Sequence, residues 1–206
     1  MAKRKQDRRV IRTKKMLRDA LTTLMVEKGF EGVTVSDLTV KADVNRATFY
    51  LHYRDKYDLL TQSEEEIITE LDEIVKVARE VKLQEVLMRD LQNDPLPFVI
   101  EMFAYFHQNA DFLKAVLGPK GDPSFQEMLK ETIKRNMLQH LVSKLDTDKM
   151  LVPVDYFIAY VSSAHLGVIQ HWLESGMNES PKEMATTLAR MTLLGPAYTA
   201  GVQRDC

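Results

Sequence analysis

Apolar side chains recur at the spacing of an α-helix over most of this sequence, and no segment shows the clear alternation that marks a β-strand. The first apolar stripe begins at Arg9 and is expected to end near Gly29, a residue type that commonly follows a helix. Residues 79–94 are polar and give no clear pattern. Later stripes predict helices over 55–78, 96–117, 124–145, 154–175 and 182–200. The pattern therefore predicts an all-α protein.

Two short helices are expected between the first stripe and residue 55. Thr34 is followed three residues later by Asp37, the spacing of an N-cap with an acidic partner, so a helix should begin here. Asp43 tolerates the left-handed conformation of a tight turn and is expected to end this helix. Asn45 is then expected to cap a further helix over 46–52 or 46–53. Two helices joined by so short a turn form a helix-turn-helix.

The second of these short helices has only about two turns, so its faces can be assigned. Phe49 and Tyr53 lie four residues apart and are expected to pack against Leu38 and Val44. The remaining face carries cations, hydroxyls and an aromatic ring, which suit the base edges and phosphates that a helix meets in a major groove. An ordinary surface helix with scattered aromatic residues is the alternative.

Individual side chains on that face fit particular DNA groups. Arg46 suits a bidentate pair with guanine, and Ala47 permits close approach or contact with a thymine methyl group. Thr48, Tyr50 and Lys56 suit phosphate oxygens. Lys56 also lies near the start of the next helix, where backbone N–H groups favour an anion. DNA recognition is therefore the leading interpretation of this stretch.

The segment VTVSDLTVKADVNRATFYLHYRDKYDLL resembles the DNA-binding domain of the tetracycline-repressor (TetR) family of bacterial transcriptional regulators. The resemblance covers residues 9–60 and depends on these positions in register: Thr34, Leu38, Ala42, Val44, Thr48, Tyr50, His52, Tyr53, Lys56 and Leu59. It implies that the DNA face consists of Val35, Ser36, Arg46, Ala47, Thr48, Tyr50, His52 and Lys56. The chain departs from the family pattern at Asp43 and Ala47, where Gly is usual or frequent, and at Thr39, where Ala is common.

The resemblance also implies a helical C-terminal domain that binds a small molecule and forms a homodimer through its last two long helices. The small residues Ser162, Ser163, Ala164 and Gly167 would allow another helix to approach closely. Two such helices and their symmetry mates would form an isologous four-helix interface, whereas a helix hairpin buried within one chain is the alternative. Dimerisation is also favoured because a short recognition helix makes few contacts, and paired half-sites double them.

The segment PLPFVIEMFAYFHQNADFL is the richest in aromatic residues and is the candidate wall of an effector pocket. Its stripe of large side chains is also compatible with ordinary core packing. Polar groups on the helix predicted over 154–175 would orient a ligand inside such a pocket. The candidate effector-binding residues are Phe98, Met102, Phe106, Tyr156, Tyr160 and His165.

Charge is distributed unevenly along the 206 residues, although the net charge is only −2. The first 60 residues hold 14 of the 28 Lys and Arg residues and 8 of the 30 Asp and Glu residues. A basic segment on an acidic body favours contact between that segment and a polyanion. Residues 1–8 are expected to be a disordered basic leader that lies along the DNA backbone or in a minor groove, and a solubilising tail is the alternative.

Other features limit the class of protein. No apolar run is long enough to span a membrane or to form a signal peptide, and the single Cys206 has no internal disulfide partner, so a cytoplasmic protein is expected. The five histidines never occur four residues apart, and neither a nucleophile elbow nor a phosphate-binding loop is present. We therefore expect no enzyme activity, no metal site and no cofactor.

The patterns and the resemblance together imply three segments: the leader 1–8, a helix-turn-helix domain over 9–54, and a helical effector-binding and dimerisation domain over 55–206. The predicted function is a ligand-responsive transcriptional regulator, in most such proteins a repressor, that binds a palindromic DNA operator as a homodimer. Its expected partners are double-stranded DNA and a partly apolar small molecule. A helical sensor or protein-interaction module that does not bind DNA is the alternative.

Overall fold

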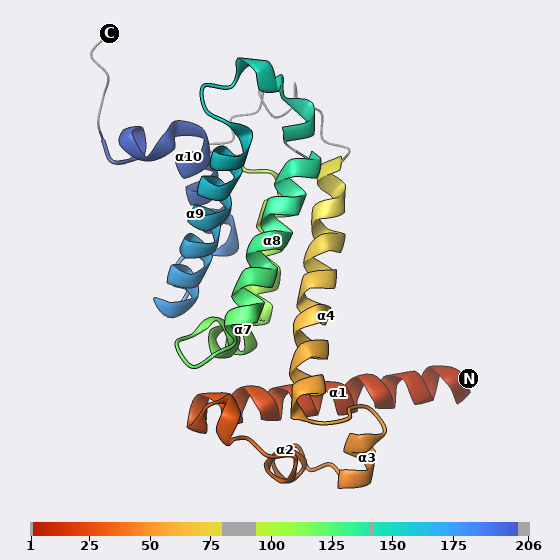
Figure 1. Ribbon diagram of the computed structural model, residues 1–206. Coiled ribbons are helices and arrows are strands. Elements are labelled where there is room, and N and C mark those ends of the chain that lie inside the picture. The colour runs from red at the N-terminus through yellow and green to blue at the C-terminus, as the bar shows by residue number, and fades with distance from the viewer. Residues whose placement is uncertain (1, 80–93, 141, 202–206) are drawn as a thin grey trace. The chain divides into compact units, whose positions relative to one another are not determined.

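The described part of the chain is built from α-helices, as seen in a computed structural model that describes residues 2–79, 94–140 and 142–201 (Figure 1). The helices are α1 (Ala2–Lys28), α2 (Val35–Lys41), α3 (Arg46–Tyr50), α4 (Lys56–Lys76), α6 (Pro97–Gln108), α7 (Ala110–Leu117), α8 (Pro123–His140), α9 (Val154–Glu174) and α10 (Pro181–Thr199). Within the described ranges there is no β-strand, and no helix is long and apolar enough to cross a membrane. The prediction of an all-α protein is confirmed.

The chain divides into two units, each with its own contacts. Unit 1 comprises Met1–Ile68 and Asp111–Gln126, and unit 2 comprises Thr69–Ala110 and Glu127–Cys206. The division differs from the domain boundary expected between residues 54 and 55. Unit 1 extends further because α7 and the turn after it pack with the N-terminal helices; for example, the Arg18 guanidinium lies 5.8 Å from the centre of the Phe112 ring. Helix α4 therefore contributes residues to both units.

Helix α1 begins earlier than its apolar stripe. The structure assigns helix from Ala2, whereas residues 1–8 were expected to form a disordered leader. Ala, Lys, Arg and Gln are strong helix formers, and no Gly or Pro occurs before Gly29, so local propensity extends the helix beyond its buried stripe. Gly29 has a φ of 75° and its N–H bonds to the Met25 carbonyl at 2.9 Å, which ends the helix as predicted.

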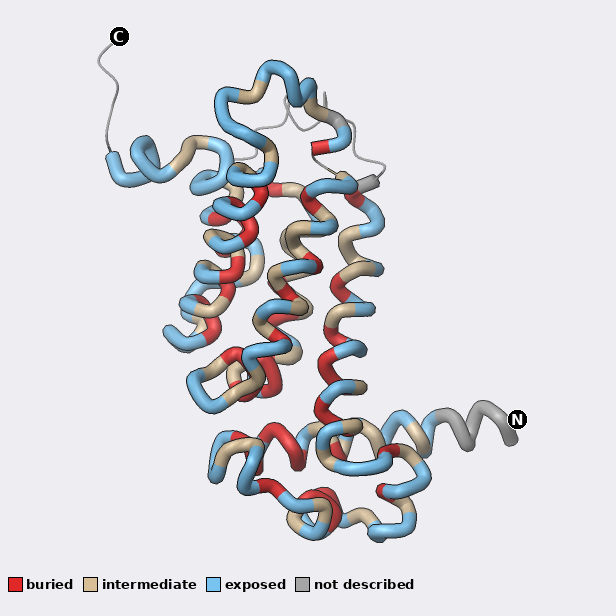
Figure 2. Tube along the Cα trace, in the orientation of Figure 1, coloured by how far each residue is buried: buried red, intermediate tan, exposed pale blue. Residues whose placement is uncertain are grey.

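The core of unit 1 is formed by fully buried apolar side chains. Leu17 and Leu21 of α1 have no exposed surface, and neither do Leu38, Phe49 and Leu59 of the three helices that follow. Figure 2 shows buried positions in red along the helices of this unit. The core therefore fixes the short helices of this unit against α1.

In unit 2, α6 packs against α10, and large aromatic side chains fill the space between its helices. The rings of Phe103 and Trp172 meet edge to face at 5.3 Å, and the Trp172 indole N–H donates to the Glu179 carbonyl at 3.1 Å. The single helix predicted over 96–117 is in fact two helices, since Asn109 adopts a non-helical conformation between α6 and α7.

Specific residues determine where α10 begins and where it kinks. Ser180 and Glu183 form a capping box at its start, and Pro181 occupies the first turn, where proline is favoured. Near its end, Gly195 has φ 75° and ψ 168°, and Pro196 follows. The helix therefore kinks at Gly195, and the residues after it form a separate short turn.

Candidate nucleic-acid interface and ligand cavity

The start of α2 is fixed by a capping box, as the sequence predicts. The Asp37 backbone N–H donates to the Thr34 hydroxyl at 3.2 Å, and the Thr34 N–H donates to the Asp37 carboxylate at 2.9 Å. The Lys28 ammonium donates to the same carboxylate at 2.7 Å, which links the end of α1 to α2. Hydrogen bonds from Lys28 and Thr34 lower the pKa of Asp37 to about 2, so this carboxylate is ionised at neutral pH.

The turn between α2 and α3 also follows the sequence pattern. Asp43 has a φ of 51°, in the left-handed region. The Asn45 side-chain oxygen accepts a hydrogen bond from the Ala47 N–H at 2.7 Å and so caps α3. Helix α3 ends at Tyr50, two or three residues earlier than expected, and the His52 N–H turns back to the Phe49 carbonyl at 2.9 Å.

One face of α3 is anchored and the other is open. Phe49 is fully buried and Tyr53 is 4% exposed, which confirms the predicted inner face. On the outer side, the Arg46 guanidinium donates to the Tyr50 hydroxyl at 3.3 Å and lies 5.7 Å from the centre of its ring. No carboxylate pairs with Arg46 among the described residues. Its charge is therefore available to an external anion or base.

The other residues expected on the DNA face differ in exposure. Ser36, Ala47 and Tyr50 are exposed, whereas Val35, Thr48 and His52 are half-buried. Together with Arg46, they put hydroxyl, imidazole, guanidinium and methyl groups at or near the surface of α2 and α3. This set of groups suits contacts with both DNA phosphates and base edges.

Lys56 has a different arrangement from the one expected. Its ammonium donates to the backbone carbonyls of Phe30 and Glu31 at 3.1 and 3.0 Å, and only 14% of its side chain is exposed. The ammonium also lies 4.8 Å from the Phe30 ring and 5.1 Å from the Tyr57 ring. In the described structure Lys56 joins the start of α4 to the 3₁₀ turn η1 (Phe30–Gly32), and the contact of its ammonium with phosphate stays a prediction.

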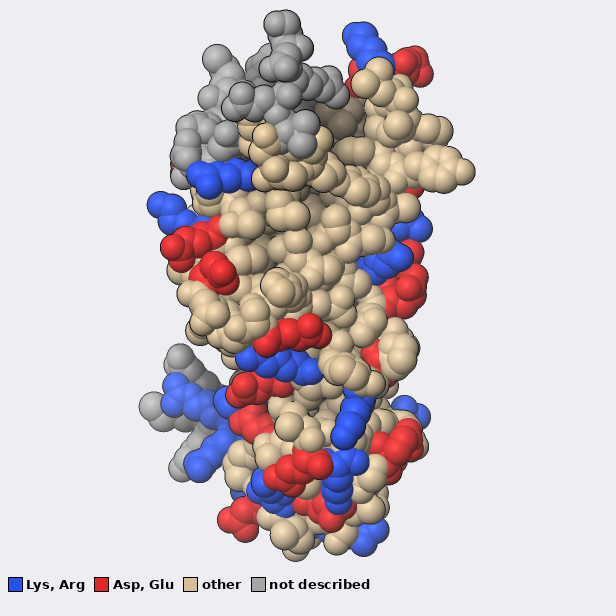
Figure 3. Space-filling view, turned by 90° about the vertical axis from the view of Figure 1, so that its left-hand side faces the viewer, with Lys and Arg blue, Asp and Glu red and all other residues tan. Residues whose placement is uncertain are grey.

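Helices α9 and α10 present an outward face with few charges. On α9, Tyr156 and Tyr160 are 74% and 55% exposed, and Ser163 and Gly167 are exposed further along the helix. Met191 of α10 is 42% exposed. Figure 3 shows a broad uncharged area over these helices, whereas acidic and basic side chains alternate around α1 to α3. Of the other small residues expected at a helix interface, Ser162 is fully buried and Ala164 is half-buried.

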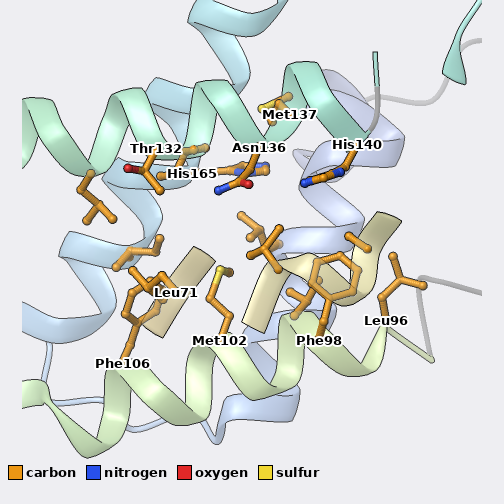
Figure 4. A pocket seen from close by; sticks show the side chains of 17 residues that line it. Leu71, Leu96, Phe98, Met102, Phe106, Thr132, Asn136, Met137, His140 and His165 are labelled. Carbon is orange, nitrogen blue, oxygen red and sulfur yellow. The ribbon is translucent and has the colours of Figure 1, made fainter. Parts of the chain in front are cut away.

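Unit 2 contains a cavity of about 240 Å³ (Figure 4). Its described lining residues come from α4, α6, α8, α9 and α10 and from the turns beside them: Leu71, Val75, Ala78, Leu96, Phe98, Val99, Met102, Phe106, Leu129, Thr132, Ile133, Asn136, Met137, His140, His165, Ile169 and Leu188. Four of the six candidate effector-binding residues are in this lining. They are Phe98, Met102, Phe106 and His165.

Tyr156 and Tyr160 are outside the described lining and are exposed, so the expectation that they border the cavity is wrong. The reason is the helical period. Nine residues, or two and a half turns, separate Tyr156 from His165, so these two side chains leave α9 on opposite sides. Since His165 faces the cavity, Tyr156 faces away from it.

Most polar groups in the lining come from α8, and sequence reasoning missed them. Thr132, Asn136 and His140 are spaced four residues apart, so they share one side of the helix. This spacing was the available signal, but α8 is polar on much of its surface, and the stripe was not distinctive. Asn136 donates to the Asp72 carboxylate at 3.0 Å, and Arg135 donates to the same carboxylate at 2.7 Å. The Asn136 side chain is therefore held in one orientation.

His165 is neutral and its tautomer is defined by its partner. Its Nε2 lies 3.0 Å from the Thr192 hydroxyl oxygen. Thr192 donates its only hydroxyl proton to the Leu188 carbonyl at 2.7 Å, so it must accept from the imidazole N–H. Burial lowers the pKa of His165 to about 4, because the charged form loses its hydration. The imidazole therefore carries its proton on Nε2 and a lone pair on Nδ1.

Two short helices, a four-residue turn and an open cationic face on the second helix define a helix-turn-helix regulator. The family model described as "Bacterial regulatory proteins, tetR family" matches residues 17–62, and one described as "Transcriptional regulator C-terminal region" matches residues 93–193. The chain belongs to the TetR family of transcriptional regulators.

Known relatives agree with this assignment. The chain is 28% identical over 190 residues to the uncharacterised HTH-type transcriptional regulator YxbF of Bacillus subtilis (strain 168), and the match covers 87% of this chain and 44% of that protein. The chain thus spans less than half of the length of this relative.

Among solved structures, the fold is similar to that of a TetR regulator from Streptococcus agalactiae 2603V, with a TM-score of 0.61, 23% identity and coverage of 91% and 97% of the two chains. It is also similar to the TetR-family regulator PfmR from Thermus thermophilus, with a TM-score of 0.64, 19% identity and coverage of 88% and 95%. FadR from Bacillus subtilis, solved in complex with stearoyl-CoA, matches with a TM-score of 0.51, 12% identity and coverage of 88% and 98%. At these identities the likeness concerns the fold alone.

Proposed function

We propose that this chain is a ligand-responsive repressor that binds a palindromic operator as a homodimer in the cytoplasm. The observation that carries the proposal is the exposed, acid-free face of α3, in which Arg46 and Tyr50 lie together on a helix anchored by Phe49. A protein surface with a guanidinium beside a phenol is suited to a DNA groove, where phosphates and guanine edges both accept hydrogen bonds.

In the proposed complex, Arg46 pairs with a guanine and Ala47 lies closest to the bases. Ser36, Thr48 and Tyr50 donate to phosphate oxygens, and Val35 and His52 complete the contact surface. The Lys56 ammonium is assigned a supporting role, since it already bonds two backbone carbonyls. In this complex α3 makes the main contacts with DNA, and η1 and the start of α4 support the DNA-binding surface.

The homodimer is proposed to form through the outward faces of α9 and α10. Their low charge and their exposed Tyr156, Tyr160 and Met191 side chains support this assignment, because dimer interfaces are enriched in aromatic residues and Met. Ser163 and Gly167 would let the helices of the two subunits approach closely. The same face in both subunits gives a closed, two-fold symmetric pair that matches a palindromic operator.

Regulation is proposed to pass through α4. Leu71 and Val75 of this helix line the cavity, and Lys56 at its start is bonded to η1. A ligand that shifts α4 would change the separation of the two recognition helices, and successive major grooves on one side of DNA recur about every 34 Å. A coupling free energy of about 1–3 kcal/mol, common in allosteric proteins, would change occupancy about 5- to 150-fold. The family fold, and the neighbour FadR solved with stearoyl-CoA, support regulation by a small molecule.

The proposal is tested by binding of the full-length protein to the DNA upstream of its own gene at several salt concentrations. We expect tight binding that protects a palindrome, with the logarithm of the affinity falling by about 0.9 for each neutralised phosphate per tenfold rise in salt. The Arg46→Ala variant should bind about 10- to 100-fold more weakly, because a bidentate contact with a base is lost.

Lys134→Ala is the matched control, because this cation of α8, with a side chain that is 45% exposed, pairs only with Glu131 at 3.1 Å in the described structure. It should leave the affinity unchanged. Weak binding with little salt dependence, equal in both variants, would contradict the proposal and favour a module that senses a ligand without binding DNA. A selection of bound fragments from the whole genome, which should recover a palindrome if the operator lies elsewhere, completes the test.

A further inference from the structure

The cavity of unit 2 has a composition that limits which ligands it can hold. Among the described residues that line it, none is Lys, Arg, Asp or Glu. Thirteen of the seventeen lining residues are apolar. Among the four polar ones, Thr132, Asn136 and His165 are uncharged at neutral pH. A carboxylate or phosphate placed there would lose its hydration without gaining a cation, at a high cost in free energy.

A neighbouring cation on α8 does not change this conclusion. Arg135 is on α8, beside the lining residues Thr132 and Asn136, but its guanidinium donates to the Asp72 carboxylate at 2.7 and 3.0 Å. Arg135 is also outside the described lining. The carboxylate of Asp72 lies directly behind Asn136, at 3.0 Å from its amide nitrogen. An anionic ligand near Asn136 would therefore lie close to the Asp72 carboxylate. The Arg135 guanidinium, which already pairs with Asp72, would not be available to neutralise the ligand.

The polar groups whose orientation is defined are hydrogen-bond acceptors. One N–H of the Asn136 amide donates to Asp72, and the Asn136 carbonyl oxygen is left as an acceptor for a ligand. In Figure 4 the Asn136 side chain extends from α8 into the cavity, on the side facing Met102. His165 uses Nε2–H to donate to Thr192, so Nδ1 is left as an acceptor. No hydrogen bond to the Asn136 oxygen or to His165 Nδ1 occurs within the described part of the chain.

The volume of the cavity limits the size of the ligand. A cavity of about 150 Å³ in another protein holds one benzene molecule, so the 240 Å³ found here suits one substituted ring or two fused rings. The walls are flexible in part, since Met102 and Met137 border the space and methionine side chains adapt to irregular shapes. The cavity is therefore matched to a compact molecule.

We infer that the effector of this chain is an uncharged, compact and mainly apolar molecule that carries a hydroxyl or N–H donor for the Asn136 oxygen and the His165 Nδ1. The inference depends on the proposed function, because it names the ligand class of the same cavity. Asn136 and His165 are assigned as the residues that select such a donor, and the apolar walls supply most of the contact area.

Three probes of nearly the same shape test this inference by calorimetry on the full-length protein. They are 1-naphthol, which has a donor; 1-methoxynaphthalene, which lacks it; and 1-naphthoate, which is charged. We expect 1-naphthol to bind at least tenfold more tightly than the methyl ether, since the ether leaves both acceptors without a partner. We expect 1-naphthoate to bind at least a hundredfold more weakly than 1-naphthol, because its charge is buried without a counter-ion.

Variants assign the selectivity to the two residues. In Asn136→Leu and His165→Phe, the preference for 1-naphthol over its methyl ether should fall to about twofold or less when both changes are combined. The ratio of the two probes within one variant remains informative even where the variant is less stable. Gln139→Leu, which changes an exposed residue of the same helix, is the control and should keep the full preference.

Each result decides the inference. Equal binding of 1-naphthol and its methyl ether, tighter binding of 1-naphthoate, or no binding of any probe up to its solubility would overturn it. Operator affinity is measured separately with and without 1-naphthol. If 1-naphthol is preferred as expected but operator affinity is unchanged, the ligand class is supported and the proposed regulatory function fails. If the operator is bound but none of the probes binds, the ligand class fails and DNA binding is retained.

Discussion

The two units of this protein are stabilised in different ways. In unit 1, each short element has a named polar contact: Thr34 and Asp37 start α2, Asn45 starts α3, and Lys56 joins α4 to η1. Core side chains of this unit, such as Phe49, are fully buried. Unit 2 has long helices, among which apolar side chains surround a cavity of about 240 Å³.

This difference suits the two tasks. A surface that reads DNA requires side chains in fixed positions, and caps and ion pairs fix backbone segments that are too short to be stable helices alone. A cavity that accepts a ligand requires missing contacts, which lower local stability and allow the walls to move. Unit 1 is therefore expected to respond strongly to small changes in packing, and unit 2 to tolerate them near the cavity.

The largest effect is expected for Phe49→Ala in unit 1. This ring is fully buried and lies 5.4 Å from the Tyr50 ring and 5.8 Å from the Tyr53 ring. Its removal should lower the free energy of unfolding by about 3–5 kcal/mol and abolish operator binding, because α3 loses its anchor. Urea unfolding followed by circular dichroism measures the change. Val26→Ala, at a position that is 67% exposed on α1, should change stability by less than about 0.5 kcal/mol.

A smaller effect should separate the two units directly, through the same substitution made in each. Val33→Phe places a larger side chain in the filled core of unit 1, where Val33 is 2% exposed, and should cost about 1–3 kcal/mol. Val99→Phe adds the same volume beside the cavity of unit 2 and should change the free energy of unfolding by less than about 1 kcal/mol while blocking ligand binding. Equal losses of stability on urea unfolding would show that the cavity is not available space.

The smallest effect concerns Glu64, the exception to good polar pairing in unit 1. Its side chain is 2% exposed, and its Oε1 accepts no hydrogen bond from the residues that the structure describes. Burial, with the nearby charges of Asp122 and Glu65, raises the pKa of Glu64 to about 8. The folded protein therefore keeps this carboxyl protonated at a pH where the unfolded chain, with a pKa near 4.5, is ionised.

Because the unfolded chain binds fewer protons in this range, stability should fall as the pH rises from 4.5 to 8.

The contribution of His165 to the pH dependence of stability has the opposite sign. Its pKa falls from 6.5 to about 4 on folding, so stability rises as the pH increases through that range. Between pH 6.5 and 8 the effect of Glu64 therefore exceeds that of His165, and a loss of about 1–2 kcal/mol is expected across this window. Urea unfolding at several pH values should show that Glu64→Gln removes this loss and that Glu70→Gln, an exposed residue of α4, retains it. An unchanged slope in Glu64→Gln would mean that the carboxyl is already ionised.

Much of unit 1 could be predicted because its signals are local. The capping box of Thr34 and Asp37 and the cap at Asn45 depend on residues two or three positions apart, so the sequence alone indicates them. The role of Lys56 could not be predicted in this way. Its partners Phe30 and Glu31 lie 26 and 25 positions earlier, and only the folded chain brings them to the ammonium.

The cavity could be predicted only in part, because helix register is ambiguous where a helix is apolar on several sides. Phe98, Met102 and Phe106 define one stripe on α6, and all three line the cavity. On α9, Tyr156 and His165 belong to opposite faces, and both faces carry apolar residues, so periodicity did not select the inner one. The packing of α9 against its neighbours decides that choice, and packing is a property of the fold.

The contact between Arg46 and Tyr50 has a further consequence for the kinetics of recognition. A long arginine side chain normally loses rotational freedom when it docks, and such a loss costs about 0.5–1.5 kcal/mol for each immobilised side chain. Here the hydrogen bond of 3.3 Å already restricts the guanidinium in the free protein. Part of that entropy is lost during folding rather than during binding. The Arg46 guanidinium is thus already oriented when the protein encounters DNA. This orientation reduces the conformational search between the first encounter and a specific complex.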